Sequence, residues 1–533
     1  MNSTSATAVR SARANVWMAA CAAAAAMGAI SAPAQAAQPS PAQASLVLHA
    51  DHPGPKIARD IYGQFSEHLG DGIYGGLWVG PDSKIPNTRG FRNDVVAALK
   101  ALNVPMLRWP GGCFADSYHW RDGIGPREKR PVTLNGWGLV EEPNAVGLHE
   151  FMDFAQMIGA QVYVNGNLGT GAPGEMADEV EYITSASRST LAEQRRANGR
   201  KDPWPLAWFA IGNEPWGCGG NMRPEYYADQ VRQRAMFLRM PDNDKAKIIA
   251  SGGQPDDLHW TETVMANAGK QIDGYTLHYY TIPGESWEHK GSSTGFDETA
   301  WISTIAHALR MDDFITRHSA VMDRYDPEKR VALVVDEWGN WYDADPGTNP
   351  AFLRQQNTLR DAVTAAMTLN IFHRHADRVR MTEIAQTVNV LQAMILTDGD
   401  RMVLTPTYHV FDLYRPFQDA TFLPVDIKAP PYVHGGISVP GVDASAARGA
   451  DGVVHLALVN PSPENAVHAE VRLEGVIGHT LSGRILTAPQ IDAANTFDHP
   501  DRVRPAAFNG AKLSGGGLSI DLPAKSVVVL ELR

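Results

Sequence analysis

Apolar runs alternate with longer amphipathic stretches from Ile61 to about Phe417, and this alternation limits the possible folds of the chain more than any other feature. Eight runs can be counted, the last of them the least clear: 61–66, 104–109, 161–165, 207–212, 247–251, 275–278, 332–336 and 379–384. Strands that alternate with helical stretches are typical of βα units and a parallel sheet. Eight such units close a (β/α)8 barrel. We therefore predict an α/β fold built on a (β/α)8 TIM barrel.

After about Asp419 the pattern changes to short alternating or β-branched runs that Pro, Gly and Asn separate. These runs are 453–459, 469–473, 480–486 and 526–532. They predict a C-terminal antiparallel β-sandwich domain, and the strand-like residues 45–49 could complete it. The expected organisation is therefore a signal peptide, an N-terminal segment joining the sandwich, the catalytic barrel and the sandwich, at 1–36, 37–60, 61–418 and 419–533.

The first 36 residues differ in composition from the rest. Arg10 and Arg13 precede an alanine-rich apolar segment over 16–30, and a small-residue site ends at Ala36. This pattern predicts a secretory signal cleaved near Ala36, and hence a secreted or periplasmic protein. The segment is too short for a membrane span, so no membrane association is expected. Cys21 could instead mark a lipid anchor, but the apolar stretch before it is very short.

The charge and cysteine content exclude several classes of function. The 533-residue chain has a formal net charge of −12 and no basic run, so nucleic acid is not an expected partner. Beyond the predicted signal only Cys113 and Cys218 remain, too few for a disulfide scaffold and without zinc-ligand spacing. They follow the second and fourth predicted strands, so they should approach each other, either as one disulfide or as two buried thiols.

Two of the apolar runs end in a glutamate beside a tryptophan. The fourth run ends in Asn213-Glu214-Pro215-Trp216 and the seventh in Asp336-Glu337-Trp338. Catalytic residues of a parallel barrel lie at the C-terminal ends of its strands, and a pair of carboxyl groups is what glycoside hydrolysis requires. A single strand-end acid often serves only a helix terminus or a salt bridge. Two of them, each beside tryptophan, favour Glu214 and Glu337 as catalytic residues.

Other predicted strand ends supply polar and aromatic side chains. They are Glu67, His68, Arg108, Asn165, Asn167, His278, Tyr279, Tyr280, Gln386 and Asn389. A sugar site needs this mixture, because hydroxyl groups require fixed hydrogen-bond partners and the ring face packs on aromatic groups. Two alternatives stay open. Arg108 could contact sugar or anchor a carboxylate, and His278 could belong to the site or be a core histidine bonded to the backbone.

Metal and esterase chemistry find little support. His373 and His375 lie two residues apart, so on a helix they point in different directions, and neither they nor the pair His149-Glu150 has an evident third ligand. We therefore expect no metal site. No Gly-x-Ser-x-Gly segment lies near a His/Asp pair, so an esterase would lack its nucleophile.

Several segments, spread in order over the whole barrel, resemble the retaining α-L-arabinofuranosidases of glycoside hydrolase family 51. They are IYGQFSEH at 61–68, LRWPGG at 107–112, GNEPW at 212–216, DEW at 336–338, QTVNV at 386–390 and LTPTYHVF at 404–411. The sandwich matches that family by architecture more than by motif. This resemblance implies an acid/base after the fourth barrel strand and a nucleophile after the seventh.

The resemblance also implies roles for individual residues. Glu214 would be the general acid/base and Glu337 the nucleophile, with no cofactor needed, and Asn213 would hold the sugar 2-hydroxyl. The remaining sugar contacts would be Glu67, Arg108, Tyr280 and Gln386, with His278 orienting its cluster and Trp137 and Trp341 as aromatic walls. Cys113 departs from the family pattern, in which asparagine is common, so a polar sugar contact is missing or replaced there.

The implied activity is exo-acting release of terminal α-L-arabinofuranosyl residues from arabinoxylan, arabinan or derived oligosaccharides, by a homo-oligomer that the family suggests is a hexamer. An endo-acting glucanase or xylanase on the same scaffold is the alternative. A non-catalytic carbohydrate-binding protein is disfavoured because both glutamates are present.

Overall fold

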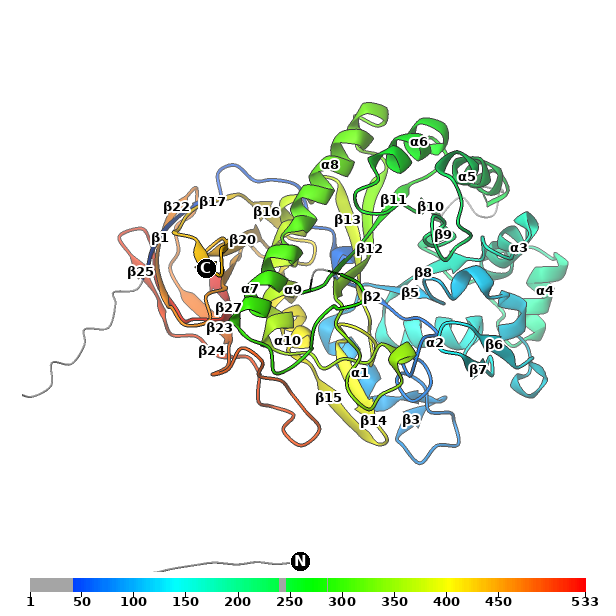
Figure 1. Ribbon diagram of the computed structural model, residues 1–533. Helices are drawn as coiled ribbons and strands as arrows, with labels where there is room; N and C mark the ends of the chain where they lie inside the picture. Colours follow the sequence, from blue (N-terminus) through cyan, green and yellow to red (C-terminus); the bar gives the residue numbers. More distant parts are fainter. Residues whose placement is uncertain (1–41, 239–245, 285) are drawn as a thin grey trace, which may run out of the picture. The chain divides into compact units, whose positions relative to one another are not determined.

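Eight parallel strands close into a barrel in a computed structural model that describes residues 42–238, 246–284 and 286–533 (Figure 1). The predicted signal segment 1–36 lies outside these residues. In order around the barrel the strands are β10 (Lys247–Ala250), β11 (Gly274–Thr281), β12 (Ala332–Asn340), β13 (Val379–Ala385), β2 (Gly63–Phe65), β5 (Met106–Trp109), β8 (Gln161–Gly166) and β9 (Trp208–Ile211). Each of the eight predicted runs overlaps one of these strands, so the predicted barrel is confirmed.

Helices surround the strands on the outside (Figure 1). They are α1 (Asn93–Leu102), α2 (Leu148–Ile158), α3 (Pro173–Thr184), α4 (Thr190–Ala197), α5 (Pro224–Leu238), α6 (Leu258–Ala268), α7 (Glu298–Ala308), α8 (Arg310–Tyr325), α9 (Leu359–Arg374) and α10 (Pro406–Tyr414). Both faces of the barrel strands are covered, which explains why the strands read as continuous apolar runs. Among the described helices, none has the length and apolar character needed to cross a bilayer.

Four short β-hairpins lie outside the barrel sheet. They are β3 (Asn87–Thr88) with β4 (Phe91–Arg92), β6 (Thr133–Asn135) with β7 (Val140–Glu142), β14 (Ile395–Asp398) with β15 (Arg401–Leu404), and β18 (Tyr432–His434) with β19 (Ile437–Val439). The hairpin of β6 and β7 matters for the site, because the turn between its strands carries Trp137.

The C-terminal residues form two sheets with an apolar core between them. One contains β17 (Val425–Lys428), β1 (Ala42–His49), β22 (Val467–Glu474), β26 (Gly517–Leu522) and β25 (Ala511–Ser514). The other contains β16 (Thr421–Leu423), β20 (Asp443–Arg448), β21 (Val454–Asn460), β27 (Ser526–Leu532), β23 (Leu481–Leu486) and β24 (Ala506–Ala507). Strand β1 pairs in parallel with β22, although we expected an antiparallel sandwich. No hairpin imposes the antiparallel direction on β1, because the whole barrel separates it from β22 in the chain.

Helix α9 connects the barrel to the sandwich. The helix begins with a capping box formed by Thr358 and Asp361, and every residue from Leu359 to His373 is buried. The His373 ring contacts the hydroxyl of Tyr62 at 2.7 Å on the barrel side and that of Ser445 at 2.9 Å on the sandwich side. His373 therefore fastens two parts of the chain together.

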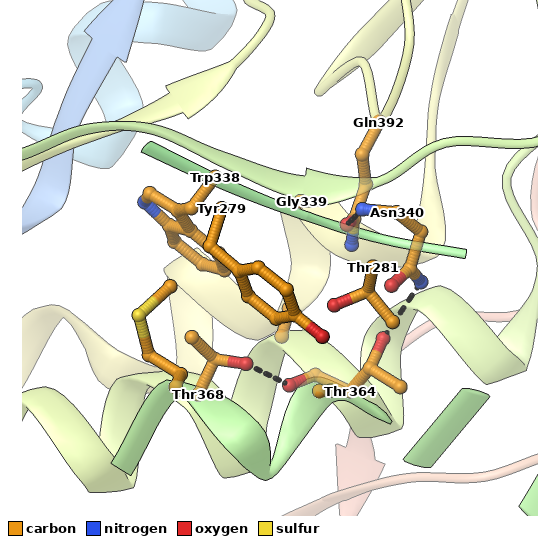
Figure 2. A pocket seen from close by; sticks show the side chains of 11 residues that line it. Tyr279, Thr281, Trp338, Gly339, Asn340, Thr364, Thr368 and Gln392 are labelled. Atoms are coloured by element: carbon orange, nitrogen blue, oxygen red, sulfur yellow. Dashed lines mark hydrogen bonds between the residues drawn. The ribbon is translucent and has the colours of Figure 1, made fainter. Parts of the chain in front are cut away.

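The strand that carries Glu337 packs closely on α9. Figure 2 shows the small cavity between them, whose volume of about 10 Å³ is roughly that needed for one water molecule. Beside it, the Asn340 side chain donates a hydrogen bond to Thr364 Oγ1 at 2.8 Å, and Thr368 Oγ1 donates to the Thr364 carbonyl at 2.9 Å. The C-terminal end of β12 is thus held from behind, which limits movement of Glu337.

Candidate active site

One large cavity, about 960 Å³ in volume, contains most of the predicted site residues. Its lining includes Glu67, Cys113, Trp137, Glu214, His278, Tyr280, Glu337, Trp341 and Gln386. Arg108 and Asn213 are buried next to these residues, and Arg108 contacts both Glu337 and Asn213. The structure therefore brings all eleven predicted side chains to one place, at the ends of the barrel strands.

Glu214 reaches the cavity through a sharp change in backbone direction after β9. Gly212 has a φ of 75° and Glu214 a φ of 40°. A positive φ costs free energy at Glu214, because its Cβ crowds the backbone, so surrounding contacts must hold the residue there. Its Oε1 atom lies 3.0 Å from Nδ1 of His278.

Glu337 lies on β12 and is 6% exposed. Its Oε1 accepts a hydrogen bond from Arg108 Nη1 at 2.9 Å, and its Oε2 accepts one from the Tyr280 hydroxyl at 2.8 Å. Two donors therefore fix the orientation of this carboxylate.

Arg108 lies at the centre of the cluster and has no solvent exposure. Besides Glu337, it donates to the carbonyl of Asp336 at 2.9 Å and to Asn213 Oδ1 at 2.7 Å. Burial alone would lower the pKa of Arg108, but the neighbouring Asp336, Tyr163 and Glu337 raise it above its ordinary value. Of the two roles left open by the sequence, the structure shows the contact with a carboxylate.

His278 bridges three carboxylates. Its Nδ1 lies 3.0 Å from Glu214 and 3.6 Å from Glu337, and its Nε2 lies 3.1 Å from Asp336. Burial opposes the charged form, but Glu337 and Asp336 raise the pKa of His278 well above its usual value. The imidazole is therefore a cation at neutral pH, and its ring nitrogens face side chains of the site instead of the backbone.

Glu67 and Gln386 form one wall of the cavity. Glu67 Oε1 accepts hydrogen bonds from the backbone N–H groups of Gly112 at 3.0 Å and Phe114 at 3.3 Å, and Gln386 Nε2 donates to Glu67 Oε2 at 3.1 Å. Burial, and then the charge of Glu337, raise the pKa of Glu67 to about 7. The protonation of Glu67 therefore depends first on its burial and then on the charge of Glu337.

Cys113 and Cys218 form a disulfide, with Cα atoms 5.6 Å apart. The predicted approach of the two loops is confirmed. Cys218 Sγ lies 3.7 Å from Glu214 Oε2, so the bridge lies directly beside this carboxylate. Both sulfur atoms are bonded to each other and cannot act as thiolate ligands of a metal.

Two tryptophans of the cavity had no predicted role. Trp216 belongs to the Asn-Glu-Pro-Trp motif and lines the cavity next to Glu214. Trp287, in the loop after β11, is 54% exposed and lies nearly perpendicular to Trp341, with ring centroids 5.4 Å apart. The motif could have indicated Trp216, whereas no periodicity marks Trp287, because it lies in an irregular loop.

A metal cation in this site would meet positive as well as negative side chains. One atom each of Glu214, His278 and Glu337 lie within 4.8 Å of one another, a spacing that could surround an ion. However, the guanidinium of Arg108 and the charged ring of His278 already neutralise the carboxylates. The arrangement favours two carboxyl groups that act on a neutral sugar.

Comparison with known proteins finds similar sequences and similar structures among the α-L-arabinofuranosidases. The alpha-L-arabinofuranosidase 1 domain family matches residues 98–298, and the alpha-L-arabinofuranosidase C-terminal domain family matches residues 336–526. An enzyme of Bacteroides ovatus named intracellular exo-alpha-L-arabinofuranosidase is 48% identical, over 92% of this chain and 96% of its own. Among solved structures, the GH51 arabinofuranosidase of Xanthomonas axonopodis pv. citri is 55% identical with a TM-score of 0.91, over 92% of this chain and all of that one. The Thermotoga maritima alpha-L-arabinofuranosidase in an arabinose complex is 29% identical with a TM-score of 0.82, over 92% and 99%.

These comparisons correct one expectation. We expected a secreted or periplasmic protein from the composition of residues 1–36, but the relative that is 48% identical is named an intracellular enzyme. The expectation was wrong because an alanine-rich stretch after two arginines is a compositional pattern, and composition alone does not determine export.

Replacing Glu67 by glutamine should change how stability depends on pH. The pKa of Glu67 is raised in the folded protein to about 7. The wild type therefore loses stability as the pH rises from about 4.5 to 7, while Glu67→Gln, which keeps the uncharged form, does not. The unfolding free energy of Glu67→Gln, relative to that of the wild type, should therefore rise by roughly 3 kcal/mol across this range.

Urea unfolding at a series of pH values measures this difference. Glu128→Gln, at an exposed glutamate, is the control and should show no such slope. A constant difference between Glu67→Gln and the wild type would show that folding does not raise the pKa of Glu67.

Proposed function

Because the chain belongs to the family 51 α-L-arabinofuranosidases, we propose that it is an exo-acting retaining glycoside hydrolase that releases terminal non-reducing α-L-arabinofuranosyl residues. The observation that carries this proposal is the pair Glu214 and Glu337, two carboxylates in one cavity with different partners. Glu337 is held by a guanidinium and a phenol, whereas Glu214 faces the imidazole of His278.

We assign the two steps of a retaining mechanism to these two carboxyl groups. Glu337, which Arg108 holds by a hydrogen bond, attacks the anomeric carbon and forms a glycosyl-enzyme. Glu214 protonates the departing oxygen and then activates the water that releases the sugar. One oxygen of Glu214 lies within 4.8 Å of one oxygen of Glu337, well below the separation of roughly 6.5 Å or more that an inverting enzyme needs for an intervening water.

The walls of the cavity support the exo-acting assignment. On one side Glu67 and Gln386 are hydrogen-bonded to each other, and on another the Cys113–Cys218 bridge lies beside Glu214. A terminal sugar would sit against these walls, whereas an endo-acting glucanase or xylanase needs a groove open at both ends. Asn213, Tyr280 and Gln386 would hold the sugar hydroxyl groups, while Arg108, which has no solvent exposure, holds Glu337.

Aromatic side chains form the more exposed part of the cavity. Trp137 is 40% exposed, and Trp341 packs edge-on against Tyr280 with ring centroids 5.0 Å apart. Flat apolar surfaces of this kind suit the leaving group, which is the part of the substrate to which the arabinosyl residue is attached. We therefore propose arabinoxylan, arabinan and their oligosaccharides as the substrates.

The two glutamates should fail in different ways when replaced by alanine. Glu337→Ala should lose turnover of every substrate by about 10⁴-fold or more, because no covalent intermediate can form. Glu214→Ala should keep a fast first step on an aryl arabinofuranoside with a good leaving group, and then stall. Azide should restore its turnover and give a glycosyl azide of retained configuration.

Product configuration by NMR checks this assignment. An inverted azide from Glu214→Ala, with a retained one from Glu337→Ala, would exchange the two roles. Failure of the wild type to release arabinose from any arabinofuranoside would refute the proposed function itself.

Trp341→Ala should weaken recognition of the leaving sugar more than it affects bond cleavage. We expect KM for arabino-oligosaccharides to rise roughly tenfold, the value of one lost stacking contact, with kcat on an aryl arabinofuranoside nearly unchanged. Steady-state kinetics on both substrates measure the effect, with aryl β-xyloside and carboxymethylcellulose as tests of the alternative. An equal loss of kcat on both arabinosides would show that Trp341 acts in the chemistry.

A further inference from the structure

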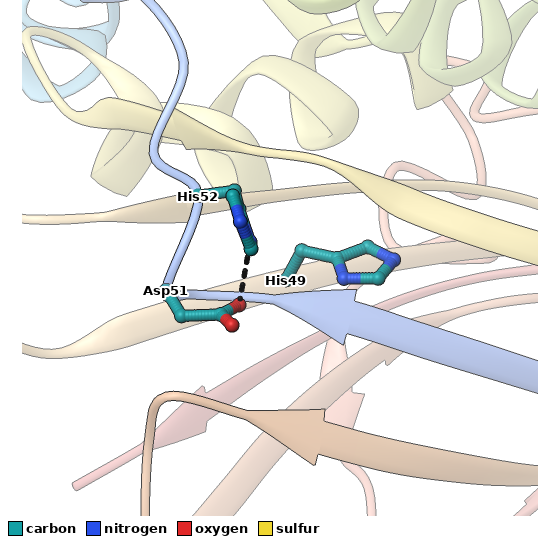
Figure 3. Close-up of side chains that lie close together, drawn as sticks. All are labelled: His49, Asp51 and His52. Atoms are coloured by element: carbon teal, nitrogen blue, oxygen red, sulfur yellow. Dashed lines mark ion pairs between the residues drawn. The ribbon is translucent and has the colours of Figure 1, made fainter.

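Two histidines and an aspartate lie together on the sandwich surface, away from the residues that line the active site. Figure 3 shows His49 at the end of β1, and Asp51 and His52 in the turn that follows it. One ligand atom of each lies within 4.8 Å of the other two. The backbone N–H of His52 donates to the His49 carbonyl at 3.4 Å, so the turn itself brings the two rings to the same place.

Carboxylates surround His49 on both sides of its ring. Its Nδ1 lies 2.7 Å from Glu474 on β22, and its Nε2 lies 3.1 Å from Asp426 on β17. Histidines that bind metals usually hold a carboxylate with their second nitrogen, which fixes the ring and raises its basicity. Whichever nitrogen of His49 binds an ion, the other keeps such a partner.

We propose that His49, Asp51 and His52 form a surface site for a divalent transition-metal ion of the zinc class. Imidazole and carboxylate groups suit these ions. Ligands of tetrahedral zinc lie about 3.3 Å apart, so the site needs only small side-chain movements. The side chains of His52 and Asp51 form an ion pair at 3.2 Å and are 78% and 43% exposed, so few packing contacts oppose these movements. A bound ion would fasten the turn after β1 to the end of its own strand.

Zinc titration of the chelator-treated protein tests the site. Isothermal titration should show one saturable Zn²⁺ per chain and a raised unfolding midpoint, since an ion that binds only the folded state stabilises it. His52→Ala removes an exposed ligand and should weaken binding at least tenfold, with the aryl arabinofuranosidase rate unchanged. His119→Ala is the control, because His119 is also exposed but has a single carboxylate partner, Glu175.

Cobalt absorption provides a second measurement, since its intensity reports the coordination geometry. Absence of saturable binding, or equal affinity of the wild type and His52→Ala, would overturn the proposal. Zinc that inhibits turnover over the same concentration range in both proteins would place the ion in the active site instead, and would overturn it as well.

A second inference concerns Asp116, and it rests on the proposed function. Asp116 is 3% exposed and lies three residues after Cys113 in the loop after β5. Its Oδ2 accepts a hydrogen bond from the backbone N–H of Asn213 at 2.9 Å. Its Oδ1 accepts two more, from Leu168 at 2.8 Å and Gly169 at 3.1 Å. The carboxylate thus joins the loops after three neighbouring strands.

The segment around Glu214 folds closely over this carboxylate. A Cβ atom added to Gly219 would lie 2.7 Å from Asp116 Oδ2, and one added to Gly212 would lie 3.2 Å from Oδ1. Glu214 keeps its positive φ only while external contacts hold its segment. We infer that Asp116 is a positioning residue that holds the acid/base Glu214 in place.

Asp116→Asn tests this role, because an amide cannot accept hydrogen bonds on both sides. Proton donation matters most for poor leaving groups. We expect kcat/KM to fall about 100-fold on an arabinosyl xylo-oligosaccharide and less than tenfold on a nitrophenyl arabinofuranoside. Glu179→Gln, at another buried carboxylate, should leave both values unchanged. Equal losses on both substrates, or none, would overturn the inference, whereas an inactive wild type would refute the proposed function.

Discussion

The buried guanidinium of Arg108 holds the centre of this structure together. Its group lies 4.3 Å above the ring of Phe65 and binds atoms from the ends of β9 and β12. Asp336 and Glu337 are adjacent in the chain, and their negative charges would repel each other if no cation lay beside them. Arg108 and His278 supply two positive charges where burial makes each unpaired charge costly. Asp336 and Glu337 can therefore be buried in defined orientations.

Much of the barrel could be predicted because of this burial. Strands covered on both faces are apolar along their whole length, so even the eighth run, around Val379, was visible in the sequence. Glu214 and Glu337 could be predicted because each places a charged residue at the end of such an apolar run. The parallel pairing of β1 with β22 was not predictable, because partners so distant in the chain leave no local signal of direction.

The predicted site residues were found where strand ends meet, but their partners depend on tertiary structure. His278 could equally have been a core histidine, because the three carboxylates around it come from two other strands. Asp116 is an unremarkable loop residue until the loop after β9 folds over it. Trp287 shows the same limit, since nothing in an irregular loop indicates where its side chain points. Sequence reasoning therefore located the proposed catalytic groups better than the groups that hold them.

The complete burial of α9 also bears on how such enzymes can be assembled from parts. A barrel expressed without its sandwich would expose an apolar helix face, and would leave Asn370 and His373 without Asp443 and Ser445. The sandwich is therefore no interchangeable accessory that could be exchanged for another binding module by cutting at the connecting residues. Recombination in this architecture must carry both parts together, or redesign one face of a single helix.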